Sequence, residues 1–262
     1  MEYVKLTETG QVDLEDLKNK LRPDTILVTI ASINSELGIS QPINEIGKIV
    51  AQYKKAYFHS DITQSIGKEK LDLTYVDLAS FSAQKFYGMK GIGALLKKEQ
   101  IVLEPLIHGG KSTTKERSGT PPTALIVSMA KALRLVYENF TEKNKLVSDK
   151  NKILRAFFQQ QNILINSPKN AIPHIINISM PNIKPETMLH ALESEDIYIS
   201  TQTACATSLQ SKAVYAVTKD VIRAAYSLRI SLSYLTTEQE LNKFMDVLLT
   251  KQKELEVLNE KN

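Results

Sequence analysis

The sequence predicts an α/β protein, because short apolar runs that suit buried strands alternate with segments of helical periodicity. Residues 25–31 form a continuous apolar run of the kind found in strands that are buried on both faces of a parallel sheet. Residues 43–54 follow as a helix with isoleucine and valine along one side. Further strands are expected at residues 56–60, 76–82 and 92–97, and a helix at residues 122–140.

A different set of elements is expected after residue 141. Residues 143–161 have the pattern of a charged helix. Residues 236–257 have that of an amphipathic helix, and Thr237 with Glu240 predicts a capping box at its start. Between these two helices we expect strands at residues 174–180, 196–201 and 226–232 and a helix at residues 185–193. The chain should therefore divide into a larger domain, residues 1–141, and a smaller α+β domain, residues 142–262.

The composition is that of a soluble globular protein, with 42% hydrophobic and 24% charged residues. The formal charge of +4 gives little reason to expect direct nucleic-acid binding. No apolar run is long enough to span a bilayer, and we expect no membrane association and no signal peptide. With one cysteine, Cys205, an intramolecular disulfide is impossible, which fits a cytoplasmic location.

The sequence predicts neither a phosphate-binding P-loop nor a metal site. Gly110-Lys111-Ser112 resembles the end of a phosphate-binding P-loop, but the glycine that the motif needs is replaced by Pro105. The histidines at 59, 108, 174 and 190 have neither close spacing nor a cysteine partner, so we expect no metal site.

Three reactive side chains lie next to predicted strands. Asp61 comes just past one strand, where ligands of open α/β sheets collect, and Lys85 follows a later strand. Cys205 lies in a run of small polar residues, which favours an exposed thiol. Each residue alone also fits an ordinary role, as a helix cap, a surface lysine or a small buried side chain.

Together, the lysine and the aspartate predict a site for pyridoxal 5'-phosphate. The amine of Lys85 can form a Schiff base with the cofactor aldehyde, and we expect this lysine to be buried and desolvated. The carboxylate of Asp61 can pair with the protonated pyridine nitrogen, which keeps the ring an electron sink. The thiolate of Cys205 could then attack an activated substrate group.

At these segments the sequence resembles the cysteine desulfurases of the class V aminotransferase fold. The similar segments, in the family's order, are Asn34-Ser35-Glu36-Leu37-Gly38, His59-Ser60-Asp61, Ser82-Ala83-Gln84-Lys85, His108-Gly109-Gly110, Arg117-Ser118-Gly119-Thr120, 200–205 and 227–231. The resemblance implies the PLP-transferase type I fold. Residues 1–141 would be the C-terminal part of the large, cofactor-binding domain, and residues 142–262 the small domain that carries the cysteine loop.

The resemblance also implies residue roles. Lys85 and Cys205 would be catalytic, the first as Schiff-base lysine and proton shuttle, the second as carrier of a persulfide. The implied cofactor-binding residues are Asn34, Asp61, Gln64, Ser82, Gln84, Lys85 and Thr120. Thr120 would reach the phosphate of a partner subunit, which implies a homodimer. Asn34 and Arg229 would bind the substrate, with Arg229 pairing its carboxylate.

The implied reaction converts L-cysteine to L-alanine and holds the sulfur on Cys205 for a sulfur-acceptor protein of iron–sulfur cluster assembly or transfer-RNA thiolation. Two alternatives stay open: a catalytically incompetent remnant, and another class V activity such as selenocysteine lyase. The sequence departs from the family pattern at Gln84, usually histidine, at Met89, usually proline, and at residues 111–116. The family's N-terminal part, with a phosphate-cradling turn and a ring-stacking histidine, is expected to lie outside this sequence.

Overall fold

The computed structural model describes residues 1–110, 115–201 and 210–260 and divides the chain into two compact units. Unit 1 comprises Met1–Asp13, Asn34–Gln41 and Thr141–Asn262, and unit 2 comprises Leu14–Ile33 and Pro42–Phe140. None of the helices in these described ranges is long and apolar enough to cross a membrane. The predicted boundary between residues 141 and 142 concerns the family's two domains, and it stays a prediction.

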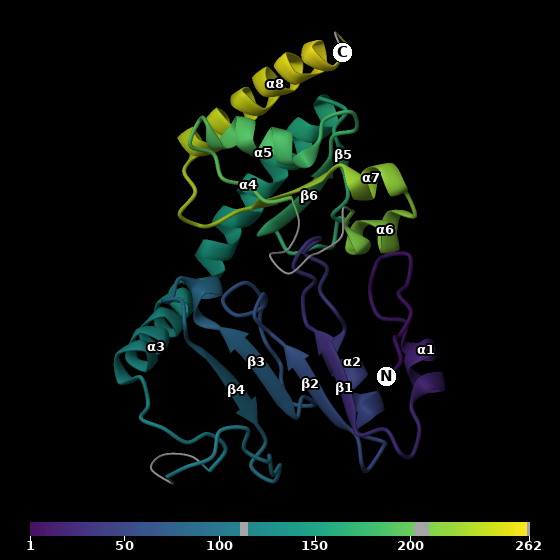
Figure 1. The fold of residues 1–262 in the computed structure, drawn as a ribbon, viewed down its shortest axis with the longest axis vertical. Coiled ribbons are helices and arrows are strands. Elements are labelled where there is room, and N and C mark those ends of the chain that lie inside the picture. The colour runs from purple at the N-terminus through teal and green to yellow at the C-terminus, as the bar shows by residue number, and fades with distance from the viewer. Residues whose placement is uncertain (111–114, 202–209, 261–262) are drawn as a thin grey trace. The chain divides into compact units, whose positions relative to one another are not determined.

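Unit 2 is built on a four-stranded sheet with the strand order β1-β2-β3-β4 (Figure 1). Its strands are β1 (Leu27–Ala31), β2 (Tyr57–Asp61), β3 (Leu78–Ser82) and β4 (Gly93–Lys97). The first three strands are parallel, and β4 pairs antiparallel with β3. The helices are α1 (Leu14–Lys20), α2 (Ile43–Val50), the 3-10 helix η1 (Ala83–Phe86) and α3 (Thr123–Tyr137). The strands thus agree with the predicted ones to within two residues at each end.

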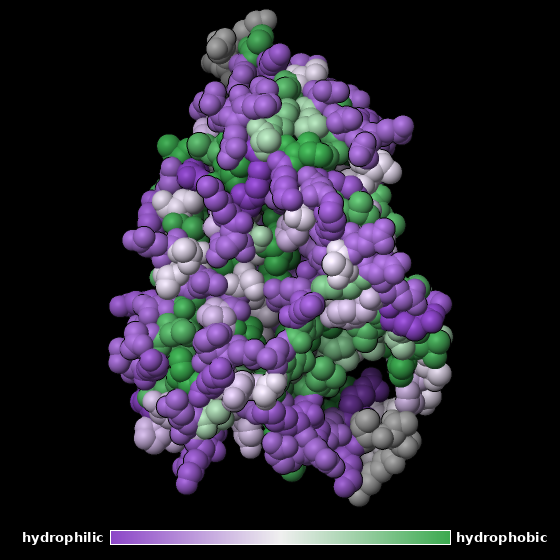
Figure 2. Space-filling model, turned by 180° about the vertical axis from the view of Figure 1, so that it is seen from behind, coloured by the Kyte–Doolittle hydropathy of each residue, from purple (hydrophilic) through white to green (hydrophobic). Residues whose placement is uncertain are grey.

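The two faces of this sheet differ. On one face Phe58 and Ala79 are buried, and α2 packs against β2. On the other face Leu27, Tyr57 and Leu95 are 50%, 45% and 52% exposed. Figure 2 shows one side of the molecule, on which hydrophobic residues (green) reach the surface among polar ones. The second face of this sheet is therefore open within the described chain. Parallel sheets are normally covered on both faces, so this face is unusual.

Unit 1 contains a three-stranded antiparallel sheet in the order β5-β6-β7. The strands are β5 (Leu164–Ile165), β6 (Ile175–Ser179) and β7 (Ser227–Ser231). The helices are α4 (Phe140–Gln160), α5 (Pro185–Glu193), α6 (Lys212–Thr218), α7 (Val221–Ala225) and α8 (Glu238–Glu260).

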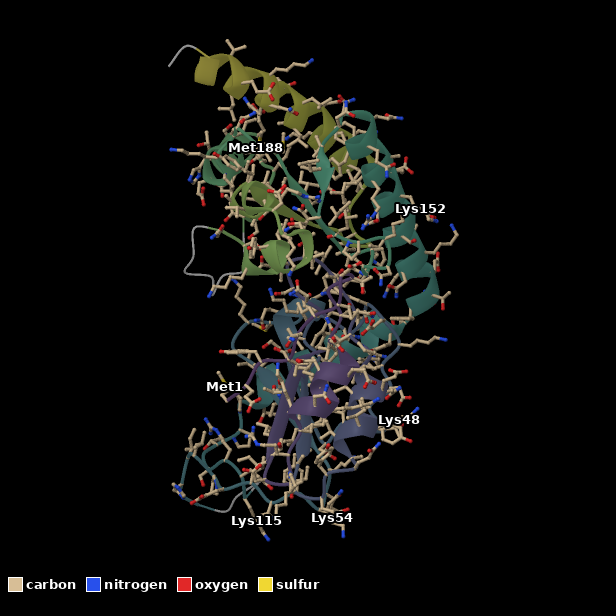
Figure 3. All side chains as sticks on the ribbon, turned by 90° about the vertical axis from the view of Figure 1, so that its right-hand side faces the viewer. Met1, Lys48, Lys54, Lys115, Lys152 and Met188 are labelled. Carbon is tan, nitrogen blue, oxygen red and sulfur yellow. The ribbon has the colours of Figure 1, made fainter. Side chains whose placement is uncertain are left out.

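Alternation along β6 and β7 separates an apolar face from a polar one. Ile176 and Ile178 pair in register with Ile230 and Leu228, and all four belong to one hydrophobic core. Helices α4, α5 and α8 complete that core with Leu154, Phe158, Met188, Phe244 and Leu248. Figure 3 shows Met188 on α5 and Lys152 on the outer side of α4. Asn177 and Ser179 alternate with these isoleucines along β6 and turn to the opposite face of the sheet.

The prediction of a strand at residues 196–201 in unit 1 is wrong. The segment at 196–201 forms no strand and makes a single antiparallel bridge, between Ser200 and Arg229. The apolar alternation of Ile197 and Ile199 is satisfied differently, because both side chains pack against the core as partly buried residues.

The predicted cap at the start of α8 is confirmed. The backbone N–H of Thr237 donates to the Glu240 carboxylate at 2.7 Å, and the N–H of Glu240 donates to the Thr237 hydroxyl at 3.1 Å. Each side chain thus satisfies a backbone donor that the helix leaves unpaired.

Thr237→Ala is expected to destabilise unit 1 by about 1 kcal/mol, since alanine offers no acceptor at the N-cap. Urea unfolding measures this change. Thr250→Ala is the matched control: the Thr250 hydroxyl bonds to the Asp246 carbonyl inside the same helix, where alanine is the better helix former. Equal midpoints for wild type and Thr237→Ala would contradict a stabilising role of the cap.

Candidate functional site

Asp61 ends β2 at the carboxyl edge of the sheet (Figure 1). Its Oδ1 accepts a hydrogen bond from the N–H of Thr63 at 2.9 Å, and its backbone carbonyl accepts one from the N–H of Ser32 at 2.9 Å. In register it faces Ser80 of β3. The side chain is therefore held by a local turn, while the residue itself stays exposed.

His59 lies two residues before Asp61 on the same face of β2. One ring nitrogen is 2.7 Å from the Thr29 hydroxyl, and the other is 3.0 Å from the Ser80 hydroxyl. The ring thus links three neighbouring strands beside Asp61. His59 was not predicted as a site residue, although the period of two along a strand places it on the same face as Asp61.

Lys85 lies on η1, which follows β3 directly. Ala83 and Phe86 are buried on the inner side of this short helix, and the Phe86 ring lies 5.8 Å from that of Phe81. Gln84 and Lys85 point the other way and are exposed. The prediction of a buried, desolvated Lys85 is therefore wrong for the described chain. The inner side of η1 is buried, but no described residue covers the Lys85 side chain.

The turn after Lys85 depends on Gly88. The N–H of Gly88 donates to the Ala83 carbonyl at 2.9 Å, and Tyr87 before it has a left-handed φ of 67°. A Cβ on Gly88 would lie 2.9 Å from the same carbonyl oxygen and 2.8 Å from the Ala83 side chain. Only glycine fits this approach without moving η1.

The other residues assigned to the cofactor lie in unit 2 at different places. Ser82 ends β3 and precedes η1, so it shares the carboxyl edge with Asp61. Gln64 is partly buried in the turn after β2, where its side-chain oxygen accepts a hydrogen bond from Lys68. Thr120 is exposed and follows Gly119, which has a φ of 115°.

Asn34 belongs to unit 1 and organises a tight turn. Its Oδ1 accepts from the N–H groups of Glu36 and Leu37 at 3.0 and 2.8 Å, and its carbonyl accepts from Gly38 at 2.9 Å. A Cβ on Gly38, whose φ is 74°, would lie 3.2 Å from Ile175 of β6. The side-chain oxygen is used inside the turn, so the Asn34 amide N–H is the group left to bind a ligand.

Arg229 of β7 lies next to this turn. Its Nη1 donates to the Ser35 carbonyl at 3.2 Å, whereas its Nε is enclosed and has no hydrogen-bond partner within the described chain. Burial lowers the pKa of the Arg229 guanidinium, and the nearby Glu36 carboxylate partly offsets this effect. Ser211, at the N-cap of α6, donates to that same carboxylate. Cys205 lies outside the described residues.

The structure thus brings Asp61, Ser82 and Lys85 to one sheet edge in unit 2, and Asn34 and Arg229 to one turn in unit 1. The chain thus joins an α/β unit, with these side chains after its parallel strands, to an antiparallel sheet that carries a partly buried arginine. Over residues 1–244 the sequence matches the aminotransferase class-V family. The chain belongs to that family, and the predicted α/β fold is confirmed.

Named relatives agree with this membership. A NifS/IcsS protein homolog of Lactobacillus delbrueckii subsp. bulgaricus is 41% identical over 245 residues, which are 90% of this chain and 63% of the relative. The cysteine desulfurase IscS of Dictyoglomus turgidum is 37% identical, over 94% of this chain and 64% of the relative. The chain therefore spans less than two thirds of the length of either relative.

A solved structure of a NifS-like protein superposes with a TM-score of 0.87 at 32% sequence identity. The match covers 94% of this chain and 66% of that protein. The arrangement of strands and helices described above is thus that of a NifS-like protein over nearly the whole chain.

Proposed function

We propose that this chain is the part of a pyridoxal-phosphate-dependent cysteine desulfurase that carries the lysine, the aspartate, the arginine and the cysteine of the active site. The reaction would convert L-cysteine to L-alanine. The carbon–sulfur bond of the substrate breaks, and the sulfur joins Sγ of Cys205 as a persulfide, so that no external oxidant is consumed. Relatives bearing the name cysteine desulfurase support the proposal.

The donor set at the sheet edge fits pyridoxal phosphate in its chemistry. An exposed primary amine on a rigid support, Lys85, suits an aldehyde, and a carboxylate held in a turn, Asp61, suits a pyridinium nitrogen. Gln64 would donate to the ring's phenolic oxygen, with Asn34 near it, and Ser82, Gln84 and a partner subunit's Thr120 would bind the phosphate. When bound, the cofactor supplies an electron sink.

The observation that carries the proposal is Arg229, whose side chain is partly buried and whose Nε is enclosed. A guanidinium taken out of water costs free energy unless an anion compensates it, and the Glu36 carboxylate offsets only part of the effect of burial on its pKa. A carboxylate bound by the two-pronged arginine would supply the missing charge. Arg229 would thereby orient the substrate, while Lys85 moves protons and Cys205 accepts sulfur.

The proposal extends to the oligomeric state, the sulfur acceptor and the cellular location. We propose that the enzyme works as a homodimer and hands its sulfur to an acceptor protein of iron–sulfur cluster assembly or transfer-RNA thiolation. The lone cysteine of the chain supports a reducing, cytoplasmic setting.

Cys205→Ser is expected to abolish a mass increase of one sulfur atom that the unmodified chain shows after incubation with pyridoxal phosphate and L-cysteine. Since the chain has one cysteine, intact-protein mass spectrometry reads this change directly. The chain should be measured alone and together with the part of a relative that it does not cover. Absence of the mass increase in both cases would refute the proposal and favour the incompetent remnant.

A further inference from the structure

Asn177 of β6 directly faces Arg229 of β7. Arg229 uses its backbone N–H and carbonyl to bond Ser200, at 2.7 and 3.2 Å. Asn177 turns its own backbone groups the other way, toward the Ser167 hydroxyl and the Asn166 N–H. The two residues therefore form a non-hydrogen-bonded antiparallel pair, in which facing side chains lie closest, with Cα atoms about 4.5 Å apart.

A chain of hydrogen bonds from Arg223 through Asn166 fixes the orientation of the Asn177 amide. Nε of Arg223 donates to Oδ1 of Asn166 at 2.8 Å, and arginine can only donate. The other end of Asn166 is therefore its NH₂ group, which donates to Oδ1 of Asn177 at 2.7 Å and to the Ser179 hydroxyl at 2.7 Å. The Asn177 oxygen is thus taken, and its Nδ2 lies on the other side of the amide.

Two donors without acceptors remain between β6 and β7. Nδ2 of Asn177 and Nε of Arg229 are both enclosed, and neither has a hydrogen-bond partner among the described residues. Two donors cannot bond each other, and native proteins rarely leave such groups unsatisfied. One oxygen acceptor placed between facing side chains satisfies both. Because both nitrogens are enclosed, the acceptor must be small, and a buried water molecule is the species that proteins use in such places.

We propose that Asn177 is a positioning residue for Arg229, and that the two side chains share one buried water molecule as acceptor. This inference rests on the proposed function, in which Arg229 binds the substrate carboxylate. The shared acceptor holds Nε, and the Ser35 carbonyl holds Nη1, so the plane of the guanidinium is fixed at two points. The remaining Nη hydrogens are left for the carboxylate.

Asn177→Asp tests the proposal. An aspartate still accepts from Asn166 but presents a negatively charged oxygen to Nε, so it pairs with Arg229 and displaces the shared acceptor. We expect the Nε–H NMR signal of Arg229, assigned with Arg229→Lys, to shift. We also expect the affinity of the chain for L-alanine, used as the carboxylate probe, to fall by roughly tenfold or more. Asn177→Ala, which loses the donor without adding charge, should speed solvent exchange of the same N–H.

Ser231→Asp is the matched control, because it adds the same charge on the same face of β7 but faces Ile175. It should leave the Arg229 signal in place. An unchanged signal in both Asn177 variants, or an equal shift in Ser231→Asp, would overturn the inference. If L-alanine fails to affect Arg229 in the wild-type chain, the carboxylate role fails instead, and the ligand-free spectra still decide the role of Asn177.

Discussion

Lys85→Ala is expected to abolish covalent attachment of pyridoxal phosphate to this chain. Nζ of Lys85 is the exposed amine that η1 presents after the parallel strand β3, and buried Ala83 and Phe86 fix its support. Alanine keeps that support and removes the nucleophile. Incubation with the cofactor, reduction with borohydride and peptide mapping should place the label on Lys85 in the wild-type chain and nowhere in the variant.

Lys90→Ala provides the control for non-specific labelling, since Lys90 is an exposed lysine only five residues further on. It should keep full labelling at Lys85. Label that moves to another lysine in the Lys85 variant, at the wild-type amount, would remove Lys85 from the active site.

Asp61→Asn should weaken cofactor binding far more than folding. The asparagine oxygen can still accept from the N–H of Thr63, so the turn after β2 is kept. The amide cannot hold the pyridinium proton by charge. A lost charged hydrogen bond of about 1.5–3 kcal/mol predicts a roughly 10- to 100-fold weaker affinity for pyridoxal phosphate. Absorbance titration measures it, and the melting temperature should hardly change.

Asp77→Asn should show the reverse pattern. The Asp77 carboxylate accepts from the N–H of Phe58 at 2.9 Å and pairs with Lys98 at 2.8 Å, at the opposite end of the strands. The Asp77→Asn substitution is therefore expected to lower the melting temperature and to leave the affinity for pyridoxal phosphate unchanged. Equal affinities of wild type and Asp61→Asn would refute the cofactor role of Asp61.

Local signals predicted most elements of the fold. The helix expected at residues 185–193 begins and ends as predicted, because Pro185 stands at its first position. Short helices were missed even where their caps were legible. Asp220 accepts from the N–H groups of Ile222 and Arg223, yet α7 has only five residues and no apolar period to reveal it.

The site was predictable in part. A residue that ends a strand is placed by that strand, and this rule located Asp61 and Ser82. The pairing of Arg229 with the turn at Ser35 joins residues 194 positions apart in the sequence, and no local pattern encodes it. The exposure of Lys85 was not predictable either, because it depends on what covers the sheet edge and not on the residues around the lysine.

The segment Asn34–Gln41 has a consequence for the order in which the protein is made. It lies between two stretches of unit 2 but belongs to unit 1, where Leu37 and Ile39 share a small core with Val214 and Ala224. A ribosome releases the strands of unit 2 long before it reaches residue 214. This segment therefore lacks these two partners until residues 214–224 have been synthesised. Contacts of such long sequence range slow folding, so a chaperone bound to the emerging chain should raise the yield of folded chain.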